Sequence, residues 1–146
     1  MTIIVDIDGT LADNRYRQHY LEGEKKNWDG FFSEMHLDEV NCTVLDTVQR
    51  YTKCSPRHDV ILLTGRFEKH RRITEMWLKF HGVPYDVLFM RPNDDYRPDH
   101  EVKKEIYLNL IKSNNDVFLV LDDRASVVKM WRELGLTCFQ VAEGDF

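Results

Sequence analysis

Five short apolar segments alternate with stretches of helical pattern along the chain, and this alternation limits the possible folds more than any other feature. The segments are rich in Val, Ile, Leu and Phe and mostly lack polar alternation, which is typical of strands buried on both faces. Strands that alternate with helices predict a parallel α/β sheet with helices on both faces, joined by right-handed crossovers. We expect strands at residues 2–6, 60–64, 86–90, 117–122 and 137–142.

Apolar residues at helical spacing predict four helices between and after these strands. The second is closed by Gly82 and Pro84 and the last by Gly135, as helix ends often are. Each stripe is interpreted as a face that packs on the sheet, the two tryptophans included. The stripes are Val40, Val44, Val48 and Tyr51; Ile73, Met76, Trp77 and Phe80; Val102, Ile106 and Leu110; and Val127, Val128, Trp131 and Leu134.

Residues 13–39 do not fit the alternation. They are mostly polar, and Trp28, Phe31 and Phe32 gather on a predicted short helix. We interpret this segment as a small cap-like insertion over the end of the sheet, although a satellite core under a loop explains the aromatic residues equally well. The 146 residues suit one domain, and no linker or repeat divides them, so we expect a single domain over residues 1–146.

Composition excludes several classes of protein. A formal net charge of −5 gives no global sign of nucleic-acid or membrane binding, so an acidic ligand needs a local cationic patch. The three cysteines are odd in number and lack C-x-x-C spacing, which favours a reducing compartment over a disulfide framework or a zinc site. Without an apolar run of the ~20 residues that a membrane span needs, and without a signal segment, we expect a cytoplasmic protein.

Polar residues gather where the predicted strands end, which is the edge of a parallel sheet where ligands bind. Asp6 and Asp8 follow the first strand on the same side, where two like charges repel each other. A hard divalent cation would relieve that repulsion, and Mg²⁺ is the usual ion where phosphate also binds. The other strand ends and the loop beyond the third strand carry Thr64, Gly65, Arg66, Asp99, Lys103, Asp122, Asp123 and Arg124.

Four of these motifs, "DIDGT", "LLTGR", a lysine near residue 103 and "LDDR", resemble those of the haloacid dehalogenase superfamily of phosphatases. Over nearly the whole chain, "TEMWLKFHGVPYD", "YRPDHEVKKEIY" and "MWRELGLTCFQVAEGDF" are similar to the 3′-phosphatase domain of bacteriophage polynucleotide kinase–phosphatase. The resemblance implies a Rossmann-like core whose five parallel strands are ordered fifth, fourth, first, second, third. "WDGFF" resembles a segment of free-standing small phosphatases of the same family.

The resemblance also implies a role for each matching residue. Asp6 is the expected nucleophile and Asp8 the general acid/base, while Thr64 and Lys103 hold the phosphoryl oxygens. The metal ligands are Asp6, the backbone carbonyl of Asp8, and Asp122, with Asp123 holding a metal-bound water. Gly65, Arg66, Asp99 and Arg17 match substrate-binding positions.

Several residue assignments remain open on the sequence alone. Arg15 replaces Arg17 if the insertion shifts the register, and Lys104 competes weakly with Lys103. Arg124 is interpreted as a structural ion pair with Asp122 and Asp123. The basic stretch 68–72, with Lys69, Arg71 and Arg72, fits either a solvated helix face or an attraction for a nucleic-acid backbone.

The leading functional prediction is a Mg²⁺-dependent phosphatase that removes 3′-phosphate ends from DNA or RNA through an aspartyl-phosphate. A phosphatase for nucleotides or other small phosphomonoesters is the alternative, and a non-catalytic phospho-binding domain is a third. The pattern G-x-x-x-x-G-K-[S/T] is absent, so we expect any kinase or ligase to be a separate partner. For a viral protein the compartment would be the host cytoplasm.

Overall fold

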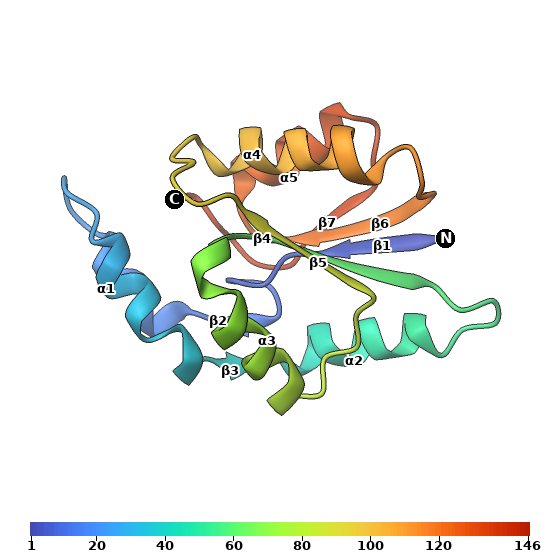
Figure 1. Ribbon diagram of the computed structural model, residues 1–146, viewed down its shortest axis with the longest axis horizontal. Helices are drawn as coiled ribbons and strands as arrows, with labels where there is room; N and C mark the ends of the chain where they lie inside the picture. Colours follow the sequence, from blue (N-terminus) through green and yellow to red (C-terminus); the bar gives the residue numbers. More distant parts are fainter.

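The computed structural model describes residues 1–146 as a five-stranded parallel sheet between two layers of helices (Figure 1). The first strand lies in the middle, and the order β5-β4-β1-β6-β7 confirms the predicted arrangement. All four neighbouring pairs are parallel, so every strand ends at the same edge of the sheet. The strands are β1 (Thr2–Val5), β4 (Asp59–Phe67), β5 (Val87–Arg91), β6 (Val117–Asp122) and β7 (Cys138–Gln140).

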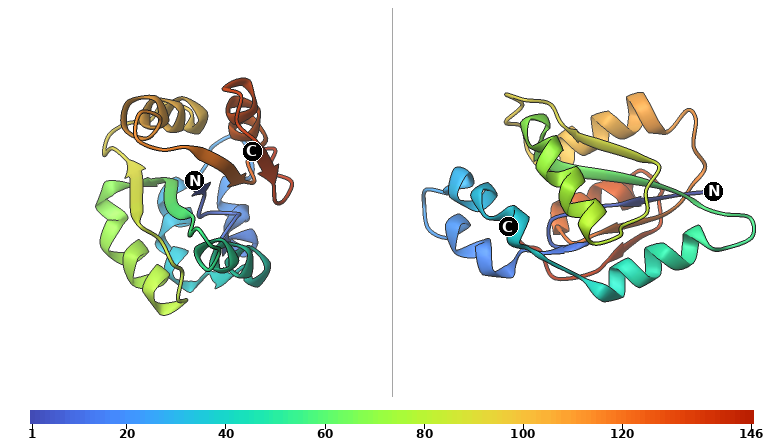
Figure 2. Two further views of the ribbon diagram at one scale, coloured as in Figure 1. Left: turned by 90° about the vertical axis from the view of Figure 1, so that its right-hand side faces the viewer. Right: turned by 60° about the horizontal axis from the view of Figure 1, so that its bottom comes forward.

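Helices α2 (Cys42–Thr52) and α3 (Arg71–Phe80) cover one face of the sheet, and α4 (Asp99–Ile106) and α5 (Ala125–Glu133) cover the other (Figures 1 and 2). Alternate residues of β1 divide between the two layers. Ile3 belongs to the core cluster that includes Val48 and Trp77, whereas Ile4 belongs to the cluster that includes Ile106 and Trp131. The central strand is therefore buried on both faces, as its apolar sequence predicts.

Two of the predicted helix faces are partly wrong. In α3 the buried residues are Thr74, Trp77 and Leu78, and Met76 and Phe80 point to solvent. The core face is thus turned by about one residue around Trp77. The chain after α4 continues as a π-helical turn over Tyr107–Ile111, which changes the helical period, so that Tyr107 and Ile111 are buried and Leu110 is exposed.

The insertion extends beyond the carboxyl ends of the strands (Figure 1, left). Strand β2 (Ala12–Asp13) pairs antiparallel with β3 (Glu39–Val40) at its base. Between them lie a 3₁₀ helix (Arg15–Leu21), helix α1 (Trp28–Ser33) and a short 3₁₀ helix (Met35–Leu37). The aromatic residues thus lie on a short helix, as predicted. Residues 13–39 are called the cap below.

None of the helices combines the length and the apolar character that crossing a lipid bilayer requires.

Candidate active site

The turn after β1 brings the first two aspartates against the loop that follows β6. Gly9 has a φ of +84°, and a Cβ at this position would overlap the carboxylate of Asp123. Only glycine meets both conditions, because it alone lacks a Cβ and readily adopts positive φ. The hydroxyl of Thr10 donates to Oδ2 of Asp6 at 3.3 Å and fixes one oxygen of that carboxylate.

Lys103 lies on α4 and links the carboxylates of Asp6, after β1, and Asp122, at the end of β6. Its Nζ donates to Oδ1 of Asp6 at 2.8 Å and to Oδ2 of Asp122 at 2.9 Å, and all three residues are buried. The neighbouring Lys104 is exposed, so the structure places Lys103 in the site. Asp6, Asp122 and Asp123 each offer a carboxylate oxygen within 4.8 Å of the other two.

The buried carboxylates around Lys103 carry more negative charge than the lysine can neutralise. Burial raises the pKa of Asp6 well above its ordinary value, and Asp122 and Asp123 add to the effect against the opposing charge of Lys103. Burial, followed by the charge of Asp122, raises the pKa of Asp123 to about 7. Three carboxylates and one ammonium leave two negative charges in excess when all are ionised, and such a cluster attracts a cation.

Asp8 has the opposite environment. Arg66 donates to both of its carboxylate oxygens, from Nε at 2.9 Å and from Nη2 at 2.7 Å, and Nη2 of Arg17 donates at 2.9 Å. Burial by itself would raise the pKa of Asp8, but the two guanidinium groups outweigh it and lower this pKa to about 2. Two carboxylates two residues apart therefore differ in proton affinity, with the higher pKa at Asp6 and the lower at Asp8.

Arg17 and Arg66 match substrate-binding positions of the family, but both side chains are buried and donate to Asp8. Arg17 also donates to Asp38 at 2.8 and 2.6 Å, so protein carboxylates occupy most of its donors. Arg15 lies on the surface and pairs with Asp13, which leaves Arg17 as the arginine of the site. Asp38 was not predicted, since no motif surrounds it.

A bulge at the end of β4 orients the side chain of Arg66 toward the carboxylate of Asp8. The register between β4 and β5 shifts after Thr64, and bulges of this kind redirect side chains beside active sites. Thr64 is buried on the strand next to β1, where its hydroxyl accepts from the backbone N–H of Arg66 and makes no side-chain bond to Asp6. Gly65 follows it, and a Cβ there would lie 2.5 Å from Oδ1 of Asp99.

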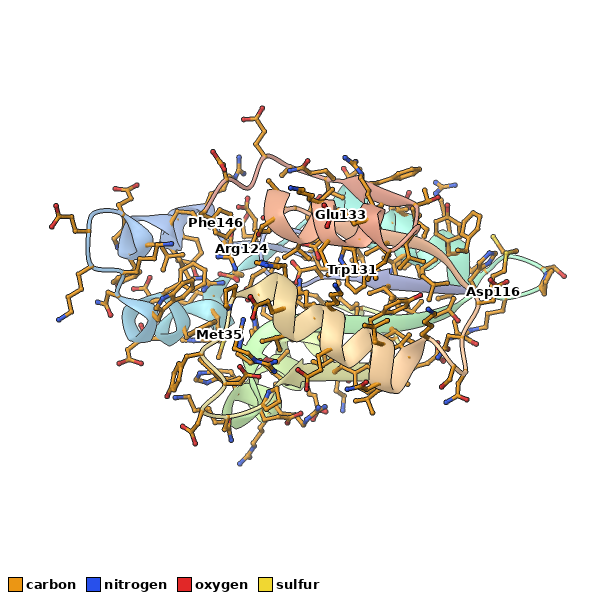
Figure 3. The ribbon with its side chains drawn as sticks, turned by 90° about the horizontal axis from the view of Figure 1, so that it is seen from above. Met35, Asp116, Arg124, Trp131, Glu133 and Phe146 are labelled. Carbon is orange, nitrogen blue, oxygen red and sulfur yellow. The ribbon has the colours of Figure 1, made fainter.

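Asp99 is held by three cations, of which Arg91 was not predicted. Nη2 of Arg91 donates to Asp99 at 3.1 Å, and Lys103 and Arg124 lie within 3.5 and 3.7 Å. Arg124 thus pairs with Asp99 rather than with the side chains of Asp122 and Asp123, because its Nε is turned to the carbonyl oxygen of Phe146 at 2.8 Å (Figure 3). The place of Arg91 at the end of β5 was the one signal in the sequence that pointed to it.

A cavity of about 550 Å³ opens above these groups. Asp6, Asp8, Asp122 and Asp123 line its floor, and the cap contributes Trp28 and Phe32 to its side. Thr64, Lys103, Arg17 and Arg66 are absent from the lining and lie beneath it.

The basic stretch 68–72 divides between the two interpretations of it. Lys69 lines the cavity. Arg71 is paired with Glu68 at 2.8 Å and with Glu75 at 3.3 Å, so these two carboxylates largely neutralise its charge. Neither Arg71 nor Arg72 lines the cavity, so Lys69 is the cation of this stretch that is available to a ligand there.

Comparisons with known proteins agree with this geometry. A protein of Autographa californica nuclear polyhedrosis virus, described as a candidate bifunctional polynucleotide kinase/RNA ligase, is 32% identical over 143 residues, which are 95% of this chain and 19% of the viral protein. A chain of the Pnkp1/Rnl/Hen1 RNA repair complex superposes with a TM-score of 0.86 at 38% identity, over 99% of this chain and 43% of that one. The chain thus spans about a fifth of the viral relative and under half of the solved one.

The structure of a candidate phosphatase from Clostridium difficile superposes with a TM-score of 0.61 at 12% identity, over 94% of this chain and 82% of that one, and supports the fold alone. Residues 1–146 match the family described as "Polynucleotide kinase PNKP phosphatase domain". With its phosphatase-type sheet and the carboxylates at the strand ends, the chain belongs to this family of haloacid dehalogenase-type polynucleotide phosphatase domains.

Proposed function

We propose that the chain is a single Mg²⁺-dependent phosphatase domain that removes the 3′-phosphate from polynucleotide ends, with residues 13–39 as a small cap. The observation that carries the proposal is the pair Asp6 and Asp8 at the floor of an open cavity, one beside Lys103 and the other held by two arginines. A binding domain has no use for an attacking carboxylate with a second acid two residues on.

The chemistry follows two displacement steps. In the first, a carboxylate oxygen of Asp6 bonds to phosphorus while the bond to the 3′-oxygen breaks, and Asp8 gives that oxygen a proton. In the second, water attacks the aspartyl-phosphate as Asp8 takes its proton, and inorganic phosphate leaves. Arg66 and Arg17 lower the pKa of Asp8 to about 2, so on this proposal Asp8 takes up the proton that it donates as the substrate binds. By the family resemblance Lys103 and Thr64 hold the phosphoryl oxygens, which requires the substrate phosphate to reach below the cavity lining, where both residues are buried.

The donor set fits Mg²⁺. Asp6, Asp122 and Asp123 offer only oxygen atoms as ligands. After Lys103 is counted, their carboxylates leave two negative charges in excess, which match a divalent cation. The backbone carbonyl of Asp8 is an additional expected ligand. When bound, the ion would neutralise charge on the transferring phosphoryl group, which is the main electrostatic demand of this reaction.

Removal of the metal should stop the reaction. We expect EDTA to lower phosphate release from an aryl phosphate by about 10²-fold or more, and added Mg²⁺ to restore it. Asp122→Asn removes one ligand charge without changing the volume, so this variant should need about 10-fold more Mg²⁺ for half-maximal activity. Unchanged activity in EDTA, with tightly bound metal shown absent by elemental analysis, would contradict the metal role.

The substrate class can be tested with three phosphate esters. On our proposal, kcat/KM for a 3′-phosphorylated oligonucleotide exceeds that for a 5′-phosphorylated one and for free nucleotides by about 10²-fold or more. A cap of this size leaves the cavity open, which admits the end of a polymer. Preference for free nucleotides would favour the alternative phosphatase, and phosphate release from any ester would exclude the non-catalytic reading.

The relatives also suggest partners. One is described as a candidate kinase/ligase, and another belongs to an RNA repair complex that includes Rnl and Hen1. We propose that this domain likewise acts beside a kinase, which makes 5′-phosphate ends, or a ligase, which joins them to the 3′-hydroxyl ends that this domain would leave.

A further inference from the structure

Four aromatic side chains form one wall of the cavity. Trp28 and Phe32 come from the cap, Phe67 from the end of β4 and Tyr96 from the loop before α4. Their ring centroids follow one another at 6.1, 6.2 and 5.7 Å, so the series runs from the cap to the loop before α4. This set is called the aromatic wall below.

The aromatic wall is too exposed to be explained by core packing alone. Tyr96 is 79% exposed, Trp28 is 39% exposed, and Phe32 and Phe67 are half-buried, so each ring keeps surface open to solvent. Phe31 on the same helix as Trp28 also borders the cavity, but it is 3% exposed and packs under Arg17, whose guanidinium lies 4.2 Å from the ring centroid. Phe31 is therefore accounted for by packing, whereas Trp28 keeps part of its ring open to solvent.

Cations accompany the rings. Nζ of Lys26 lies 5.9 Å from the centroid of Trp28, and Nζ of Lys69 lies 5.4 Å from that of Phe67. Both lysines are exposed and line the cavity. The carboxylates on the floor of the cavity would repel a phosphodiester chain. The two lysines place positive charge beside the aromatic wall, and this charge attracts such a chain.

We propose that the aromatic wall stacks the terminal nucleobase of the strand whose 3′-phosphate enters the site, with Lys26 and Lys69 beside its backbone. Proteins that bind single strands combine such rings with cations, and stacking accepts any base because each has a π-face. The volume of about 550 Å³ lies within the range of sites for small organic ligands, so phosphate and base can share the cavity. The inference rests on the proposed function and adds to it a subsite for the base.

Two 3′-phosphorylated single-stranded oligonucleotides test the wall, one with a normal terminal nucleotide and one whose terminal residue is abasic. Trp28→Ala should raise KM for the normal end by about 10-fold, through the loss of one stack, and leave the abasic end unchanged. Trp28→Phe keeps an aromatic ring and should retain most of the affinity. Phe80→Ala is the matched control, because Phe80 is an 83% exposed aromatic residue on α3 outside the cavity.

Tryptophan fluorescence gives a readout that does not depend on turnover. Trp77 and Trp131 are buried, so quenching when the normal oligonucleotide binds Asp6→Asn protein should come from Trp28 and disappear in the added Trp28→Phe change. Equal losses on normal and abasic ends, or no loss on either, would overturn the wall while leaving the proposed function intact. Failure of the wild type on every 3′-phosphorylated end, with aryl phosphate still hydrolysed, would overturn the proposed function and the wall together.

Discussion

Asp6→Asn should lower the phosphatase turnover by about 10⁴-fold or more, the size of loss seen when a catalytic nucleophile is removed. The amide keeps an oxygen that can accept from Lys103 but cannot bond to phosphorus. It also removes a buried charge from a cluster in which burial raises the pKa of Asp6 well above its ordinary value. We therefore expect the melting temperature in EDTA to equal or exceed that of the wild type, measured beside phosphate release.

Asp8→Asn should slow both chemical steps, because Asp8 is the acid of the first and the base of the second. With an aryl phosphate, whose leaving oxygen needs little protonation, the first step should suffer less, so part of the protein should hold phosphate as an acyl phosphate of Asp6, visible by intact mass after acid quenching. The same experiment on Asp6→Asn should show no added phosphate. Wild-type turnover in Asp6→Asn, or a phosphoryl adduct on it, would contradict the assignment of the nucleophile.

The fold was predictable because its signals are local and agree with one another. Continuous apolar segments such as β1 and β6 admit one solution, a strand buried on both faces, and the helices between them fix a parallel sheet. Of the two wrong helix faces, the one in α3 lies in a regular helix, where the apolar residues Met76 and Phe80 are exposed, and the other lies where the helical period changes. The π-helical turn exposes Leu110 and buries Ile111, and apolar spacing does not encode such a change in advance.

The site was predictable to the extent that it lies at strand ends. Asp6, Lys103 and Asp122 meet because parallel strands finish at one edge of the sheet. Asp38 and Arg91 were missed for different reasons. Asp38 reaches Arg17 only through the fold of the cap, whose short elements leave weak periodicity, and Arg91 was judged part of a loop although it ends β5.

Arg17→Ala should destabilise the protein and lower kcat/KM for an aryl phosphate and for a 3′-phosphorylated oligonucleotide by the same factor. Its loss leaves the buried carboxylate of Asp38 without its main partner, and breaking such a pair typically costs about 3–5 kcal/mol of unfolding free energy. Asp8 keeps Arg66 but loses one of two anchors, and a small displacement of a catalytic group costs about 10²-fold in rate. The measurements are denaturant unfolding, and kcat/KM on an aryl phosphate and on a 3′-phosphorylated oligonucleotide.

Two further variants separate stability from catalysis at Arg17. Arg15→Ala is the matched control, because this exposed arginine two residues away pairs only with Asp13, and such surface pairs contribute little to stability. The double variant Arg17→Met, Asp38→Asn removes both buried charges together, so stability should largely return while activity on both substrates stays low. A loss confined to the oligonucleotide would instead show that Arg17 contacts the polymer. Full recovery of activity in the double variant would show that Arg17 supports the fold of the cap and does not position Asp8.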